Sequence, residues 1–200
     1  MIDSIGIVNG RFQILHNDHM RYFFEAMKRC EHLIIGITNP DATLTRFSAN
    51  DPQRNDRVAN PLTYFERFQM IKGSLVEAGV EQRDFDIVPF PISHPEVLFN
   101  YVPRKGKFYL TIYDAWGYEK KRILQNAGCD IEILWEKSID EKSICGTSIR
   151  QMIANHDPWE EFVPMFVKDY VVENRIDKRI INLVKEYGKK YELTRTFNCD

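Results

Sequence analysis

Apolar residues follow two different spacings in the first forty positions of the chain. Ile5 to Val8 form a β-branched run that ends in Asn9-Gly10. A helical face follows, with apolar residues spaced i, i+3, i+4 and i+7 at Met20, Phe23, Phe24 and Met27. Leu33 to Ile37 is then almost continuously apolar, which is typical of a strand covered by helices on both faces of a parallel sheet. This order predicts a βαβ unit.

The alternation of strand and helix patterns continues to about residue 135. Further strands are predicted over 85–88, 108–113 and 131–135, and helices over 63–75 and 118–126. Thr63 and Glu66 have the T-x-x-E spacing of a capping box. Beyond Gly146 only helical patterns remain, one from Thr147, one over 158–172 and one over 177–191. We therefore predict an α/β fold, a Rossmann-like doubly wound parallel sheet with a C-terminal helical cap.

A long polar segment from Thr38 to Pro61 interrupts this pattern. It contains three prolines and the arginines Arg46, Arg54 and Arg57. A loop of this length in a compact domain is usually a lid or a binding loop. We expect it to close over an anionic substrate; the alternative is an insertion without a role.

Length, composition and charge narrow the function classes. The chain has 200 residues, of which 44% are hydrophobic and 28% charged, as in a soluble globular domain. It has no apolar run of the roughly 18 residues that a membrane span needs, and Asp3 stands where a signal peptide carries positive charge. The net charge of −2 gives no general footprint for nucleic acid. We expect a cytoplasmic protein with neither membrane nor nucleic-acid partners; self-association into a homo-oligomer is left open.

The four cysteines do not form a metal or redox motif. They are far apart, without a C-x-x-C pair, at Cys30, Cys129, Cys145 and Cys199. We expect reduced thiols that pack in the core or lie on the surface.

The first candidate site is the loop Gly10-Arg11-Phe12-Gln13-Ile14-Leu15-His16-Asn17-Asp18-His19, between the first strand and the first helix. Ligands of open α/β sheets bind beyond the carboxyl ends of the strands, where a helix N-terminus attracts phosphate. His16, His19 and Arg11 can donate hydrogen bonds to phosphate oxygens. The structural alternative is one capping histidine and one surface histidine. A zinc site is disfavoured because no third ligand is nearby.

The second candidate site is Cys145-Gly146-Thr147-Ser148-Ile149-Arg150, at the start of a late helix. Thr147 or Ser148 can cap this helix, and Arg150 can point back toward the same phosphate-binding side. The structural alternative is an ordinary N-cap with a solvated arginine.

Together, the two segments resemble the signatures of the nucleotidylyltransferase superfamily, written roughly GRFQPFHxGH and S-x-T-x-I-R. Within it, the chain is most similar to archaeal-type nicotinamide-nucleotide adenylyltransferases. Asn60-Pro61-Leu62-Thr63-Tyr64-Phe65-Glu66-Arg67 looks like their N-P-F-T-x-x-E-R segment, and Trp159 to Pro164 also has a counterpart there. The resemblance covers about residues 4–175. It implies a nucleotidylyltransferase domain over 1–175, with 176–200 as a C-terminal helical extension of the same domain.

The resemblance implies transfer of a nucleoside monophosphate from a nucleoside triphosphate, ATP or CTP, to a small phosphorylated acceptor, with release of pyrophosphate. His16, His19, Arg11 and Arg150 would be the catalytic residues, with Arg150 on the leaving phosphates. The implied nucleotide-binding set adds Gly10, Phe12, Gln13, Gly146, Thr147 and Ser148. Mg²⁺ would arrive with the triphosphate, because no carboxylate cluster looks like a dedicated metal site.

Several positions depart from the family pattern. Asp18 stands where the family has Gly, and Cys145-Gly146 occupy the serine end of the second signature. We expect Asp18 to point away from the phosphates or to cap the helix. The family's S-G-N-P segment is here Tyr113-Asp114-Ala115-Trp116-Gly117. This segment and the long loop from Thr38 to Pro61 would face the acceptor, for which the candidate residues are Arg54, Arg57, Phe99, Asp114 and Trp116.

Three functions fit these observations. The first is a nicotinamide or nicotinate mononucleotide adenylyltransferase of NAD biosynthesis, in which Trp116 or Phe99 stacks on the pyridine ring. The second is a cytidylyltransferase that activates a small phosphate or phosphonate. The third is a catalytically inactive nucleotide-binding module. Pyrophosphate release with different triphosphates and acceptors discriminates between them.

Overall fold

The computed structural model describes residues 2–41, 56–141 and 143–187. Its centre is a sheet of five parallel strands in the order β3-β2-β1-β4-β5. The strands are β1 (Asp3–Gly10), β2 (Cys30–Thr38), β3 (Phe85–Phe90), β4 (Lys107–Ile112) and β5 (Asp130–Glu136). β1 lies between β2 and β4, so the chain winds one way from β1 and the other way from β4. The predicted doubly wound parallel sheet is confirmed.

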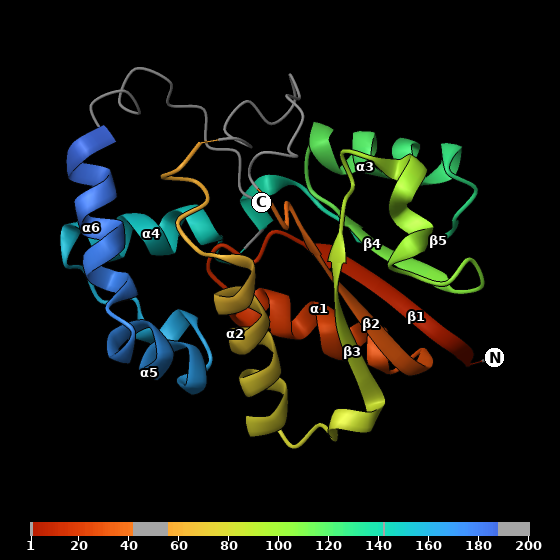
Figure 1. The fold of residues 1–200 in the computed structure, drawn as a ribbon, viewed down its shortest axis with the longest axis horizontal. Helices are drawn as coiled ribbons and strands as arrows, with labels where there is room; N and C mark the ends of the chain where they lie inside the picture. The colour runs from red at the N-terminus through yellow and green to blue at the C-terminus, as the bar shows by residue number, and fades with distance from the viewer. Residues whose placement is uncertain (1, 42–55, 142, 188–200) are drawn as a thin grey trace.

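The described residues form six α-helices around the sheet (Figure 1). They are α1 (Asn17–Met27), α2 (Tyr64–Glu77), α3 (Ala115–Asn126), α4 (Gly146–Asn155), α5 (Met165–Glu173) and α6 (Ile176–Tyr187). Short 3₁₀ turns in the described ranges are η2 (Gln82–Asp84), η3 (Pro95–Asn100), η4 (Ile139–Glu141) and η5 (Glu160–Phe162). In Figure 1, α4, α5 and α6 lie together beside α2, and α3 lies at the other end of the view.

The two faces of the sheet carry separate hydrophobic clusters. On one face, side chains of α1, α2, α4, α5 and α6 pack with β1 and β2 residues such as Val8 and Ile35. On the other, η3 and α3 contribute Leu98 and Leu124, which pack with Ile7. Alternate residues of β1 therefore serve opposite clusters, as the period of a strand requires. The nearly continuous apolar run in β2 has the same explanation.

One predicted helix is wrong. The sequence pattern predicts a single helix over 158–172, but the structure has the turn η5 and then α5. Pro164 is the N-cap of α5, and Val163 before it is extended, with φ −125° and ψ 156°. A proline disfavours helical geometry in the residue before it, which explains the break. The helix predicted over 177–191 is α6, and the end of that prediction lies outside the described residues.

Arg67 ties three elements together from inside the protein. It is 2% exposed, and its guanidinium donates to the carbonyls of Arg11, Thr38, Asn39 and Thr63 over 2.7–3.2 Å. Burial lowers the pKa of Arg67 to about 10, which still leaves it protonated at neutral pH. The planar group with its several donors suits four fixed carbonyls better than an ammonium would. Arg67 thereby fixes the loop after β1 against the end of β2 and the start of α2.

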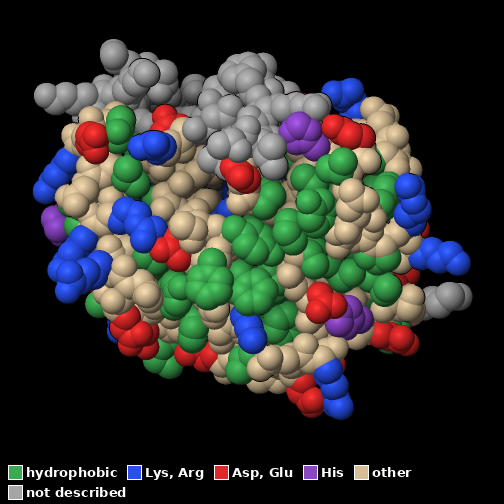
Figure 2. Space-filling view, in the orientation of Figure 1, with side chains coloured by type: hydrophobic (Ala, Val, Ile, Leu, Met, Phe, Trp, Pro, Cys, Tyr) green, Lys and Arg blue, Asp and Glu red, His purple; other side chains and the backbone are tan. Residues whose placement is uncertain are grey.

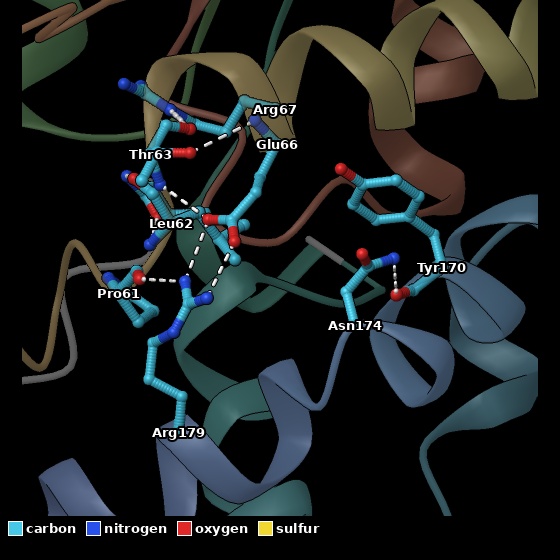
Figure 3. Close-up of polar contacts among 9 residues, drawn as sticks. Pro61, Leu62, Thr63, Glu66, Arg67, Tyr170, Asn174 and Arg179 are labelled. Carbon is cyan, nitrogen blue, oxygen red and sulfur yellow. Dashed lines mark hydrogen bonds and ion pairs between the residues drawn. The ribbon is translucent and has the colours of Figure 1, made fainter.

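The last helix is attached to α2 by an ion pair (Figure 3). Arg179 of α6 donates to both carboxylate oxygens of Glu66, at 2.8 and 2.7 Å, and to the carbonyl of Pro61 at 3.2 Å. Glu66 also completes the predicted capping box with Thr63. Ile176 and Ile180 lie in the same cluster as Val8. α6 thus packs on the main core, while the division at residue 175 stays a prediction.

β3 forms one edge of the sheet. Figure 2 shows hydrophobic side chains gathered on the face of the molecule where β3 lies in Figure 1, with charged side chains around them. Pro89 in β3 removes one backbone donor from this edge, a common feature of edge strands.

None of the helices in the described ranges has the length and apolar character needed to cross a bilayer.

Candidate active site

A cleft opens at the carboxyl ends of β1 and β4, where the winding direction reverses. It contains about 820 Å³ of empty space, open solvent included. One side is formed by the segment from Asn9 to His19, and the other by Thr111 to Lys120. Ligands of doubly wound sheets bind at this reversal point. The fold therefore brings the first signature segment and the Tyr113–Gly117 segment to one place, although about 100 residues separate them in sequence.

The two histidines meet at the start of α1. His16 is the N-cap residue and is 1% exposed, and His19 is in the first turn. The His16 backbone N–H donates to Nδ1 of His19 at 3.3 Å, and the two rings stack with centroids 3.6 Å apart. Through this bond and the stacking, the His19 ring holds His16 at the N-terminus of α1, which is the positive end of the helix dipole. Both line the cleft together with Gly10 and Arg11.

Phe12 and Gln13 have structural positions. Phe12 is 1% exposed and packs edge-on against His19 and Phe23, with a φ of 54°. The Gln13 side chain donates to the carbonyl of Leu62 and accepts from its N–H, at 3.1 and 2.9 Å. Neither residue is among those that line the cleft. They shape the loop that presents Arg11 and the histidines.

The second signature segment, at the start of α4, packs against the first signature segment at Gln13. A Cβ on Gly146 would lie 2.6 Å from the carbonyl oxygen of Gln13, so only glycine permits this approach of α4. Arg150 is 4% exposed and donates to the Gln13 carbonyl and to Thr147 Oγ1. Gly146, Thr147, Ser148 and Arg150 do not line the cleft as described. The arginine is therefore buried, in contrast to the solvated alternative.

The predicted cap of α4 is wrong. Cys145 is the N-cap residue, and both Thr147 and Ser148 lie within the first turn. The helix begins one residue earlier than predicted: Cys145 is extended, with φ −139° and ψ 161°, and Gly146 is the first helical residue. Cys145 Sγ and Ser148 Oγ share a hydrogen bond of 3.2 Å across this turn.

Asp18 connects the first signature segment to the residues just before the second. Its carboxylate accepts from Ser143 Oγ at 2.6 Å and from the Ile144 N–H at 3.4 Å. It lies in the first turn of α1 and also borders the cleft. These donors and the helix dipole reduce its repulsion of a bound phosphate. The carboxylate thus turns to the strand-to-helix connection before α4.

The opposite wall of the cleft begins at the N-terminus of α3. Asp114 caps this helix by accepting from the Gly117 N–H at 2.9 Å. Trp116 follows it, and Lys120 lies one turn further on the same side. Tyr113 accepts a hydrogen bond of 2.6 Å from Trp135 Nε1, and burial raises the pKa of its hydroxyl. This wall combines aromatic rings with a positive charge.

The remaining acceptor candidates lie elsewhere or cannot be placed. Phe99 is outside the cleft lining and packs at the second cluster, with the Arg104 guanidinium 4.3 Å above its ring. Arg57 is exposed and does not line the cleft either. Arg46 and Arg54, with most of the expected lid, lie outside the described residues. The roles of these residues stay predictions.

Five cleft residues were missed by the sequence analysis: Asn9, Tyr22, Thr111, Lys120 and Trp135. Lys120 could have been found, because it lies at i+4 from Trp116 and therefore on the same helix face. Asn9 could also have been found, as a polar residue at the end of an otherwise apolar strand. The contributions of Tyr22 and Trp135 depend on tertiary packing. Burial raises the pKa of Tyr22, so its hydroxyl stays protonated and donates to the Tyr109 carbonyl.

The described cysteines are buried and free, as expected. Burial raises the pKa values of Cys30 and Cys129 to about 11, which makes them poor nucleophiles at neutral pH. Cys199 lies outside the described residues. Within the described ranges there is also no group of three or more His, Cys, Asp or Glu side chains placed to hold a metal ion.

Comparison with known proteins agrees with this geometry. The model of the cytidylyltransferase-like family matches residues 7–152, which include both signatures. The chain belongs to this family. It is a nucleotidylyltransferase, as the resemblance implies.

Two relatives of this chain are named for different substrates. It is 40% identical to a phosphonoformate cytidylyltransferase of Streptomyces viridochromogenes, over 90% of this chain and 96% of the relative. It is 29% identical to a nicotinamide-nucleotide adenylyltransferase of Saccharolobus solfataricus, over 90% and 97% of the two chains.

The solved structures agree on the fold. A bifunctional NMN adenylyltransferase/ADP ribose pyrophosphatase from Francisella tularensis matches with a TM-score of 0.64 and 17% identity, covering 98% of this chain and 58% of the other. The match supports the Rossmann-like architecture of the chain.

Proposed function

We propose that this nucleotidylyltransferase is a cytidylyltransferase that transfers CMP from CTP to a small phosphonate or phosphate. The observation that carries the proposal is the 40% identity to a phosphonoformate cytidylyltransferase over nearly the full length of both chains. Nicotinamide-nucleotide adenylyltransferases that match the chain over a similar length include relatives that are 29% and 24% identical. The cytidylyltransferase alternative is therefore preferred to the adenylyltransferase that the sequence motifs alone favour.

The aromatic residues of the cleft fit this choice. A nicotinamide acceptor brings a second ring, for which Phe99 and Trp116 are the sequence-based candidates. Phe99 packs outside the cleft, so of these two candidates Trp116 lines it, beside Tyr113 on the wall beyond β4. A phosphonoformate-type acceptor has no ring, so one aromatic wall is sufficient for the single base of CTP.

In the proposed reaction, an oxygen of the acceptor attacks the α-phosphorus of CTP. The bond from the α-phosphorus to the oxygen that bridges it to the β-phosphate breaks, and pyrophosphate leaves with that electron pair. His16, His19 and Arg11 line the cleft at the start of α1, where they can stabilise the charge that develops on phosphoryl oxygens. Arg150 holds the loop that carries these residues, through its hydrogen bond to the Gln13 carbonyl. In the proposed reaction it also binds the leaving phosphates, as the resemblance implies.

In the proposed reaction, the metal ion is part of the nucleotide substrate. Mg²⁺ would enter with CTP and neutralise the charges of its phosphates. The residues expected to meet the complex are cationic or neutral donors, and Asp18 and Asp114 are both held by N–H or O–H groups of the protein.

The test is pyrophosphate release by the purified protein with CTP, ATP, UTP or GTP against phosphonoformate, phosphonoacetate, glycerol phosphate and nicotinamide mononucleotide. We expect turnover with CTP and a small phosphonate or phosphate. Turnover confined to ATP and nicotinamide mononucleotide would reject the proposal and establish the second candidate, which the adenylyltransferase relatives favour.

A further inference from the structure

Asn9 is a buried polar residue whose side chain has no hydrogen-bond partner among the described residues. It is 3% exposed at the end of the central strand β1, where its neighbours Ile7 and Val8 are fully buried. Within the described ranges, neither Oδ1 nor Nδ2 of its carboxamide has a hydrogen-bond partner. A buried amide in this condition destabilises a protein, and such groups require a specific explanation.

The position of Asn9 points to a ligand. It lines the cleft immediately before Gly10, with Thr111 at the end of the neighbouring strand β4. Trp116 and Tyr113 lie on the wall beyond β4, while Arg11 and the histidines occupy the other side. The carboxamide therefore lies between the aromatic wall and the phosphate-binding segment.

We propose that Asn9 is a specificity-determining residue that hydrogen-bonds the nucleobase of the bound triphosphate. A carboxamide offers one acceptor next to one donor. Cytosine and adenine both present the complementary pair, an exocyclic N–H beside a ring nitrogen that accepts. Uracil presents the pair in the opposite order, so Asn9 in one fixed orientation disfavours it.

The base is a better partner for Asn9 than a phosphate or the acceptor. Phosphates are bound most strongly by charged donors and helix N-termini, which the Arg11–His19 side of the cleft supplies. A phosphonate acceptor is small and anionic, and a neutral carboxamide beside aromatic rings does not complement it. A planar heterocycle with a polar edge satisfies both the rings and the amide.

This inference rests on the proposed function only in that the donor is a nucleoside triphosphate. The test is Asn9→Leu, which keeps a branched side chain of similar length and removes both polar atoms. Calorimetry gives the affinities for CTP, ATP, UTP and inorganic triphosphate, a probe without a base, and thermal unfolding gives the stability. Asn9→Ala is measured in parallel in case Leu is too large.

We expect Asn9→Leu to raise the melting temperature by about 2–4 °C, because an unpaired amide is replaced by apolar surface. The affinity for the accepted nucleotide should fall about tenfold or more, and its preference over UTP should decrease. Binding of inorganic triphosphate should stay within about twofold of the wild-type value, since the phosphate contacts remain.

Ser74→Ala is the matched control. Ser74 is 1% exposed in α2, and its hydroxyl also has no partner within the described ranges, but it does not line the cleft. This variant should be as stable as the wild type or more so, with unchanged nucleotide affinities.

Three results would overturn the role of Asn9. They are unchanged nucleotide affinity in both Asn9 variants, an equal loss for inorganic triphosphate, or an effect confined to the Michaelis constant of the acceptor. The cytidylyl proposal is decided separately by the wild-type protein. If that protein uses ATP, the loss of ATP affinity in Asn9→Leu still decides whether Asn9 contacts the base.

Discussion

His19 combines a structural and a chemical role in one imidazole. Its Nδ1 caps the first turn of α1, and its ring borders the cleft. His19→Ala should reduce turnover about 100- to 1000-fold, the effect of losing one preorganised donor. It should also lose about 0.5–1.5 kcal/mol of stability, because the N-cap N–H loses its acceptor. Steady-state kinetics and urea unfolding measure the two effects.

His19→Gln separates the two roles. Glutamine at this position of a helix can still accept from the N-cap N–H, as in a capping box. We expect this variant to keep most of the stability and to lose turnover like the alanine variant. Near-normal turnover in either variant would contradict a catalytic role for His19.

Arg150 depends on its planar guanidinium. It bonds the Gln13 carbonyl and Thr147 together, and lysine cannot reproduce this geometry. Arg150→Lys should weaken triphosphate binding about tenfold by calorimetry, since a charge-assisted hydrogen bond contributes about 1.5–3 kcal/mol. An unchanged affinity would place Arg150 outside the nucleotide site and leave it a purely structural residue.

At the scale of elements, the key contact is the packing of α4 against the loop after β1. Gly146→Ala would place a methyl group 2.6 Å from the Gln13 carbonyl oxygen, so α4 must move. We expect a loss of about 1–3 kcal/mol in the free energy of unfolding and a lower kcat. Gln151→Ala, at an exposed position of the same helix, is the control and should change neither quantity. A fully active Gly146→Ala would mean that the two signatures do not depend on this contact.

The elements were predictable where a local pattern determines them. The sequence predicts the strands, the Thr63–Glu66 capping box and the meeting of both histidines at the start of α1. It gives no local signal for the hydrogen bonds between Gln13 and Leu62, which are about 50 residues apart. It gives none for the burial of Arg150 either, because Arg150 bonds to Gln13, 137 residues away. The break at Pro164 had a local signal, which the helical spacing around it obscured.

At the scale of the whole molecule, the ion pair between Glu66 and Arg179 connects α6 to α2. Burial alone would raise the pKa of Glu66, but the hydrogen bonds from Arg179 and Thr63 outweigh it and hold the pKa below its ordinary value of 4.5. Because the folded state binds this proton less readily than the unfolded state, the contribution is complete above pH 4.5 and is lost as the pH falls through the lower, folded-state pKa.

Glu66→Gln should therefore lower the free energy of unfolding by about 1–2 kcal/mol at pH 7. This is less than the about 1.5–3 kcal/mol of a buried charged hydrogen bond, because Arg179 is 38% exposed and solvent screens the pair. The difference from the wild type should shrink when unfolding is measured below pH 4. A difference that is equal at pH 7 and below pH 4 would show that the charge of Glu66 does not hold α6.

We propose that one cleft, formed by the residues that follow β1 and β4, transfers CMP to a small phosphonate or phosphate. The most direct test is ³¹P NMR of a reaction in which equal CTP and ATP compete for phosphonoformate, with inorganic pyrophosphatase present. We expect the ³¹P signal of a mixed anhydride whose mass contains CMP, formed about 100- to 1000-fold more slowly by His19→Gln. An adenylylated product, or no nucleotide conjugate with any acceptor of the panel, would contradict it.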